Sequence, residues 1–187
     1  MNNFINEYPN ALGNLECDFI ISWFETNKKL HKLGETGVGF VNRDDKASTD
    51  IHMNFLDQSK NLNLIIYNAI INNIQKYRKS YPEIDEYVYP WMLRPDWNIQ
   101  KYLPGEGYFA THCETTCREN SYRVMAWMIY LNTVNNGGGT HFPQYSKTVT
   151  AEQGKLVMWP SYWTHLHHGI CSQTETKYIA TGWFSFN

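Results

Sequence analysis

The residues best suited to metal chemistry in this chain are histidines and a glutamate in two short stretches. The first stretch is His112-Cys113-Glu114, and the second is the histidine-rich run 164–169. In an extended strand, alternate side chains point to the same face, so His112 and Glu114 can offer a nitrogen and an oxygen to one ion. A third ligand from a facing strand would complete a set of two histidines and one carboxylate, which holds Fe(II) and leaves coordination positions open. The pattern therefore predicts chemistry at the metal and not only metal storage.

Three histidines in the second stretch compete for the third position, namely His165, His167 and His168. If this stretch is a strand, His165 and His167 share one face and His168 lies on the other. Lys177 follows in an otherwise apolar run. An inward ammonium group there would need an anionic partner, whereas an outward one would simply be solvated. The residues alone leave both questions open.

The second half of the chain carries the signals of short strands. Runs rich in Tyr, Trp, Val, Ile and Thr alternate with turn signals rich in Gly, Pro and Asn. Eight strands at this spacing favour a double-sheet jelly roll. The predicted strands are 97–102, 107–113, 123–131, 139–143, 147–150, 156–159, 165–169 and 177–186.

The first half is predicted to be helical. Apolar residues at three- and four-residue steps predict a helix over 15–33, with Gly34 as its C-cap, and a longer helix over 53–77 that ends before Pro82. Both helices are expected to pack on one face of the sheet. The polar segment 35–50 is predicted to be a surface loop. The expected fold class is mainly β with N-terminal helices (α+β).

Length and composition favour one soluble domain. We expect a single domain 1–187, with about 1–96 as a helical buttress and loops and about 97–187 as the jelly-roll catalytic core. A formal net charge of −2 lacks the basic character of a general nucleic-acid binder, so a nucleic-acid partner is not expected. The N-terminus has no signal-peptide pattern and no apolar run could span a bilayer, so we expect a cytoplasmic protein without membrane partners.

The cysteines raise zinc as an alternative to iron. Cys113 and Cys117 lie close to the histidines in sequence. Structural zinc sites usually draw on two Cys or His pairs at short spacing, and no second pair accompanies these two. A site with zinc alone is therefore disfavoured. We expect Cys113 to point away from His112 and Glu114.

Motifs in the C-terminal half follow one another in the order of a known family. They are the run 102–114, the strand that begins at Arg123, the glycine-rich corner 137–143, and the runs 154–160, 167–169 and 177–183. Together, from residue 98 to the end, they resemble the Fe(II)/2-oxoglutarate-dependent oxygenases of the prolyl 4-hydroxylase-like group. The resemblance implies a double-stranded β-helix (jelly roll, cupin-like) core.

The resemblance also implies the metal ligands. In the family, a lysine that binds the cosubstrate follows the distal histidine by ten residues, and His167 stands ten residues before Lys177. The implied catalytic residues and Fe(II) ligands are therefore His112, Glu114 and His167. Glu114 stands where prolyl hydroxylases of this type usually carry Asp, which leaves the substrate more open than the reaction.

The resemblance also implies which residues bind the cosubstrate. The distal carboxylate of 2-oxoglutarate would pair with Lys177 and accept a hydrogen bond from Tyr102, with Thr181 as a weaker candidate. O2 would take the remaining metal position, and ascorbate is the expected reductant.

The resemblance also suggests roles for four other side chains near the motifs. Arg123 would form a structural ion pair or contact the substrate, and Trp183 would line the pocket. His165 would be a substrate-side group or a packed histidine, and His168 a structural one.

The implied function is a 2-oxoglutarate-dependent dioxygenase that hydroxylates an unknown substrate, with peptidyl proline as one candidate. A hydroxylase of a small molecule or nucleobase is the nearest alternative. A long groove flanked by mobile loops would favour a peptide substrate, and a deep closed pocket would favour a small molecule. A non-catalytic cupin-like domain for metal binding or sensing is the alternative of another class. The substrate partner, peptide or small molecule, and the oligomeric state are left open.

Overall fold

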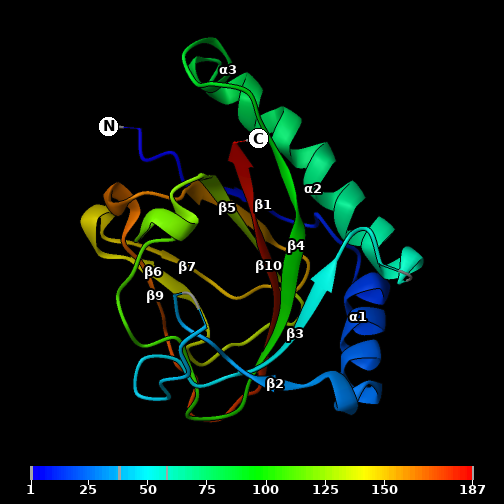
Figure 1. Ribbon diagram of the computed structural model, residues 1–187. Helices are drawn as coiled ribbons and strands as arrows, with labels where there is room; N and C mark the ends of the chain where they lie inside the picture. The colour runs from blue at the N-terminus through cyan, green and yellow to red at the C-terminus, as the bar shows by residue number, and fades with distance from the viewer. Residues whose placement is uncertain (1, 38, 58, 187) are drawn as a thin grey trace.

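The computed structural model describes residues 2–37, 39–57 and 59–186, and the strands within them are antiparallel to their neighbours (Figure 1). They are β1 Asn6–Tyr8, β2 Lys32–Leu33, β3 Thr49–Asn54, β4 Trp91–Tyr102, β5 Arg123–Tyr130, β6 Thr140–Phe142, β7 Lys147–Val149, β8 Leu156–Pro160, β9 His168–Gly169 and β10 Lys177–Phe186.

These strands form two sheets. The larger sheet has the order β1-β8-β5-β10-β4-β3-β2, and the smaller one has the order β7-β6-β9. The larger sheet lies between the smaller sheet and the helices (Figure 1). This arrangement confirms the predicted double-stranded β-helix with N-terminal helices. The prediction of a single domain stays a prediction.

The helices are α1 Asn14–Thr26, α2 Lys60–Ser80 and α3 Glu83–Glu86, with 3-10 turns at Lys28–Leu30, Arg118–Asn120, Pro143–Tyr145 and Trp163–His165. Both long helices were predicted, but their bounds were wrong at one end. The first ends at Thr26 because the chain turns there and Lys32–Leu33 pairs with β3. The second begins only at Lys60 because the residues before it complete β3 and a turn. No helix within the described residues is long and apolar enough to cross a membrane.

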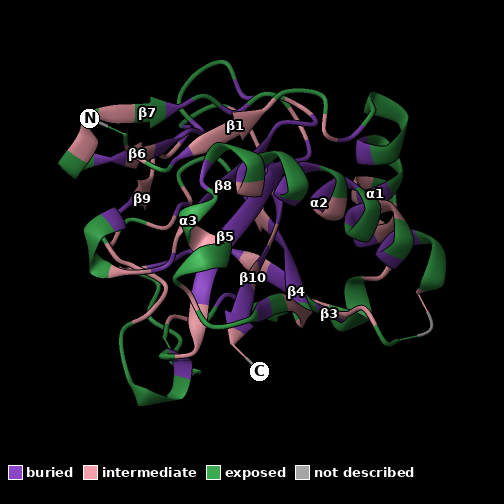
Figure 2. Cartoon of the chain, turned by 90° about the horizontal axis from the view of Figure 1, so that it is seen from above, coloured by how far each residue is buried: buried purple, intermediate pink, exposed green. Residues whose placement is uncertain are grey.

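The main core lies between the helices and the outer face of the larger sheet. Phe24 of α1, Ile66 and Ile70 of α2, and Trp97 and Trp127 of the sheet are each at most 1% exposed in this cluster. Figure 2 shows the strands β4, β5 and β10 as largely buried between the exposed faces of the helices and loops. Burial of each such side chain stabilises the fold by about 1.5–3 kcal/mol.

The inner face of the same sheet is polar at its centre, because successive side chains of a strand alternate between faces. The register pairs Lys177 with Tyr102, Ile179 with Gln100, and Thr181 with Asn98 between β10 and β4. Asp50 and His52 of β3 continue the last two rows beyond Gln100 and Asn98. The strand register therefore places these polar side chains in successive rows along one cavity.

Three predicted segments differ from the structure. Residues 107–113 form an extended loop with isolated bridges at Tyr108 and His112 instead of a strand. Of 165–169, only His168–Gly169 is a strand, because Trp163–His165 is a 3-10 turn. The segment 35–50 is not wholly a surface loop, since Lys46 and Asp50 are buried where they form an ion pair of 2.7 Å.

Candidate metal centre and cosubstrate pocket

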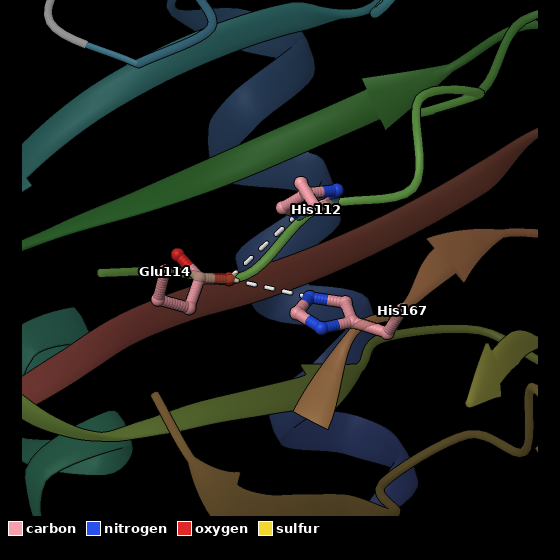
Figure 3. A group of neighbouring side chains, drawn as sticks. All are labelled: His112, Glu114 and His167. Atoms are coloured by element: carbon pink, nitrogen blue, oxygen red, sulfur yellow. Dashed lines mark ion pairs between the residues drawn. The ribbon is translucent and has the colours of Figure 1, made fainter. Parts of the chain in front are cut away.

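His112, Glu114 and His167 point toward one another (Figure 3), and all three line one cavity. One potential ligand atom from each lies within 4.8 Å of the others. Oε1 of Glu114 lies 3.4 Å from Nε2 of His167 and 3.9 Å from Nε2 of His112. The three sequence-predicted ligands thus converge on one point.

The backbone brings the two histidines together. His112 and His167 form an isolated antiparallel bridge in which each N–H donates to the other's carbonyl at 2.9 Å. The N–H of Glu114 donates to the carbonyl of Ser161 at 3.0 Å. These bonds hold the 112–114 segment across the gap between the two sheets, although neither ligand segment is a long strand.

Hydrogen bonds also orient both imidazole rings. Nδ1 of His112 donates to the carbonyl of Ala110 at 2.8 Å, and Nδ1 of His167 donates to the carbonyl of His165 at 2.9 Å. A carbonyl only accepts, so the proton of each neutral ring is on Nδ1 and the lone pair is on Nε2. Two lone pairs and a carboxylate that face one another repel unless a cation lies between them. The donor set therefore fits a metal ion of the Fe(II) type.

Glu114 is fixed through its second oxygen. Nε1 of Trp183 donates to Oε2 at 2.8 Å, and the guanidinium of Arg123 lies 3.6 Å from the same oxygen. The guanidinium also lies 3.7 Å from the centroid of the Trp183 ring. Oε1 is left to face the histidines. Arg123 therefore forms an ion pair, and Trp183 lines the cavity and holds the carboxylate.

The ionisation states suit metal binding. Burial is the main cause that lowers the pKa of His112 to about 4, and a second proton on the neighbouring His167 would lower it further. For Glu114, burial alone would raise the pKa, but His167, His112 and Arg123 outweigh it and hold the pKa well below the usual range. Near neutral pH the imidazole of His112 is neutral and Glu114 is ionised, which are the forms that ligate a metal.

The cavity beside these residues has a volume of about 450 Å³, within the range of pockets that hold small molecules. Lys177 lines it and is 6% exposed. Its Nζ lies 4.6 Å from the centroid of the Tyr102 ring. No carboxylate of the described residues lies within 4.0 Å of this ammonium, and burial lowers its pKa to about 8. A buried cation of this kind fits a bound carboxylate.

The two other predicted cosubstrate residues also line the cavity. The hydroxyl of Tyr102 donates to Oε1 of Gln100 at 2.7 Å, so its proton is already engaged in this structure. The hydroxyl of Thr181 donates to the carbonyl of Trp127 at 2.9 Å. Tyr102 thus offers the cavity its ring and an oxygen lone pair, and Thr181 a half-buried oxygen.

The sequence interpretation missed a buried polar network behind Tyr102. The carboxylate of Asp50 accepts from Lys46 at 2.7 Å, Ser48 at 2.7 Å and Gln100 at 3.1 Å. The amide of Gln100 is thereby oriented with its oxygen toward Tyr102. The alternation of polar residues 98, 100 and 102 along one strand was the signal that could have found it.

The remaining histidines and Cys113 lie outside the ligand group. His165 is buried beside the N-terminal segment, with its Nε2 2.9 Å from the carbonyl of Asn3. It does not share a face with His167, because the 3-10 turn breaks the strand alternation. His168 contacts the hydroxyl of Thr111. The thiol of Cys113 donates to a backbone carbonyl, so the described residues offer no thiolate-containing metal group.

Comparison with solved structures finds the same fold in prolyl hydroxylases. A viral collagen prolyl hydroxylase from Paramecium bursaria Chlorella virus-1, in complex with 2-oxoglutarate, has a TM-score of 0.68 at 16% identity, covering 97% of this chain and 95% of that chain. A prolyl-4-hydroxylase from Pseudomonas putida has a TM-score of 0.70 at 14% identity, with coverage of 100% and 94%. A prolyl hydroxylase from Trichoplax adhaerens, in complex with a hypoxia inducible factor peptide fragment, has a TM-score of 0.77 at 15% identity, with coverage of 98% and 84%.

At these identities the structural likeness shows the fold. A search of curated proteins finds no match. Residues 97–185, which include all three converging side chains, match the model of the 2OG-Fe(II) oxygenase superfamily. The match to this segment and the fold agree: residues 97–185 carry the pattern of the 2OG-Fe(II) oxygenase superfamily, whose enzymes use Fe(II), 2-oxoglutarate and O2.

Proposed function

We propose that this 2-oxoglutarate-dependent dioxygenase hydroxylates a prolyl residue in a peptide, with His112, Glu114 and His167 as the ligands of Fe(II). The observation that carries the proposal is that three converging side chains of metal-ligand type line one cavity together with a buried ammonium that has no carboxylate partner among the described residues. Metal and cosubstrate sites in one cavity favour an oxygenase over a domain that only stores or senses metal.

The bound Fe(II) supplies the redox chemistry, in which 2-oxoglutarate, O2 and a C–H bond give succinate, CO2 and an alcohol. The protein's own residues prepare that site. Ala110 and His165 hold the ligand rings in one tautomer through their carbonyls. Trp183 holds Oε2 of Glu114, so Oε1 stays directed at the metal position.

Lys177 is proposed as the anchor of 2-oxoglutarate. Its ammonium would pair with the distal carboxylate, and the Tyr102 ring beneath it would exclude water from that pair. Thr181, two rows along the same strand face, would contact the cosubstrate closer to the metal. Because the proton of Tyr102 is engaged by Gln100, we assign to Tyr102 a role through its ring.

Two observations support a prolyl substrate. The similar structures are prolyl hydroxylases, and one is described in complex with a peptide fragment. The rings of Tyr108, Trp159 and Trp183 line the cavity, and aromatic walls suit an apolar pyrrolidine ring.

The test is turnover by the purified protein with Fe(II), ascorbate and 2-oxoglutarate. Succinate and the gain of one oxygen are measured with three probes: N-acetyl-Gly-Pro-Gly amide, free L-proline and free nucleosides. Hydroxylation of the peptide supports the proposal, whereas hydroxylation of another probe alone identifies a small-molecule or nucleobase enzyme. Absence of iron-dependent 2-oxoglutarate binding contradicts the assignment of the site.

Lys177→Met examines the cosubstrate anchor. Loss of a charge-assisted contact is expected to weaken 2-oxoglutarate affinity about 10- to 100-fold, from ~1.5–3 kcal/mol for such a contact. Lys101→Met is the matched control, since Lys101 lies on the outer face one row from Lys177 and pairs with Glu25. An unchanged affinity in Lys177→Met would exclude the anchor role.

A further inference from the structure

We propose that the side-chain amide of Asn98 recognises the substrate by donating a hydrogen bond to a peptide carbonyl, with His52 completing the contact. This inference rests on the proposed function and names the group through which a peptide substrate would be held. Asn98 lies on the inner face of β4, one row beyond Gln100, between His52 of β3 and Thr181 of β10. It lines the same cavity as the three metal ligands.

The hydrogen-bond state of Asn98 leaves its donors free. Nδ1 of His52 lies 2.5 Å from Oδ1 of Asn98. A carbonyl oxygen only accepts, so His52 donates and the NH2 group of Asn98 is turned the other way. Among the described residues this NH2 group makes no hydrogen bond, although Asn98 is only 9% exposed. Because Asn98 lines the cavity, these two unused donors are available to a ligand that enters it.

The neighbouring polar side chains of the same strand face are already satisfied. Gln100 donates to Asp50 and accepts from Tyr102. Asp96, one row nearer the solvent, accepts from Asn54 at 2.9 Å and from Arg94 at 3.1 Å. Asn98 therefore differs from Gln100, whose NH2 group already donates one hydrogen bond, because neither N–H of Asn98 is engaged among the described residues.

The charges around Asn98 define the chemical class of that ligand. Lys46 is paired with Asp50 of β3 and Arg94 is paired with Asp96 of β4, so neither cation is left to hold an anion at Asn98. A neutral acceptor therefore fits better than a phosphate or a free carboxylate. Because Nδ1 of His52 carries the proton, its Nε2 is an acceptor at the exposed rim. Two donors beside one acceptor match the C=O and N–H groups of a peptide unit.

Asn98→Asp is the sharpest variant. It keeps the oxygen that accepts from His52 and replaces the free donors by an acceptor, with almost no change in shape. Asn98→Leu removes all hydrogen bonding at similar volume and serves as the second variant. Asn68→Asp makes the same chemical change on an exposed face of α2 and is the matched control.

The probe is N-acetyl-Gly-Pro-Gly amide, measured by succinate release and by calorimetric binding. Both Asn98 variants are expected to raise the KM for this peptide at least tenfold and to lower the ratio of hydroxylated peptide to succinate. Their affinity for 2-oxoglutarate without peptide, and their melting temperatures, are measured in parallel. The control is expected to behave as the parent protein does.

An unchanged peptide KM in folded Asn98→Asp overturns the inference. So does a parent protein that binds Fe(II) and 2-oxoglutarate but does not bind the peptide by calorimetry. A parent protein that fails to bind 2-oxoglutarate in the presence of Fe(II) instead contradicts the proposed function, so the two failures are distinguishable.

Discussion

The two faces of the central strands β4, β5 and β10 differ sharply in chemistry although they share one backbone. Outer-face residues such as Trp97, Trp127 and Ile129 are fully buried against the helices and one another. Inner-face residues such as Gln100 and Lys177 are almost as buried but polar or charged. Because adjacent residues of a strand point to opposite faces, one residue packs in the core that stabilises the fold and the next lines the cavity. Substitutions on the two faces should therefore affect different measurements.

The largest effect is expected from the three proposed metal ligands. His167→Ala removes one of three converging atoms and should lower hydroxylation about 1,000-fold or more, because the remaining pair cannot fix the metal geometry. Iron content after desalting and succinate release are measured together. His141→Ala on the smaller sheet is the control, and equal iron content in both variants would contradict the site.

Trp127→Ala should act on the other face. It removes a ring that is fully buried in the core and should reduce the free energy of unfolding by about 3–5 kcal/mol. Urea unfolding measures this change. The folded fraction should keep the KM of the parent protein for 2-oxoglutarate. A changed KM in the folded protein would show that the two faces of the sheet do not act independently.

Asp50→Asn examines the buried charge pair of the inner face. Lys46 would lose its anionic partner, and the expected destabilisation is about 3 kcal/mol, at the lower end for breaking a buried pair because an amide oxygen remains. Thermal unfolding measures the loss. A melting temperature unchanged within error would mean that Lys46 finds solvent or another partner.

The smallest effect is a pH dependence at Lys177, whose pKa is lowered by burial to about 8 from the usual 10.5. Only the charged form binds a carboxylate, so 2-oxoglutarate affinity should be level below pH 8 and fall about tenfold per unit above it. Between pH 8 and 10.5 the unfolded chain holds more protons at this site, so the ligand-free protein should become more stable as pH rises. Lys177→Met should abolish both trends, and their persistence would assign them to another group.

Much of the site could be predicted because it depends on local spacing. His112 and Glu114 two residues apart, and His167 ten residues before Lys177, are distances along the chain. The long helices and most strands of the second half were visible for the same reason, through apolar periodicity.

The parts that were missed depend on contacts between distant segments. Lys46 and Asp50 lie in a segment with the composition of a surface loop, and they are buried where they pair with each other and Asp50 accepts from Gln100 of the neighbouring strand β4. The short strand β1 joins the sheet edge through β8, about 150 residues away in sequence. No local pattern in 164–169 distinguished a 3-10 turn from a strand. The prediction that His165 shares a face with His167 was therefore wrong.

The bridge between His112 and His167 has a consequence for the metal-free protein. Two backbone hydrogen bonds join these ligand segments, and neither segment belongs to a long strand at that point. Bound iron would link the two segments through the side chains of His112 and His167. When iron is scarce, the amide protons of residues 112 and 167 should exchange with solvent well before those of β5 or β10. The iron supply of the cell would then set not only the rate of the enzyme but also how long this end of the molecule stays closed to proteases.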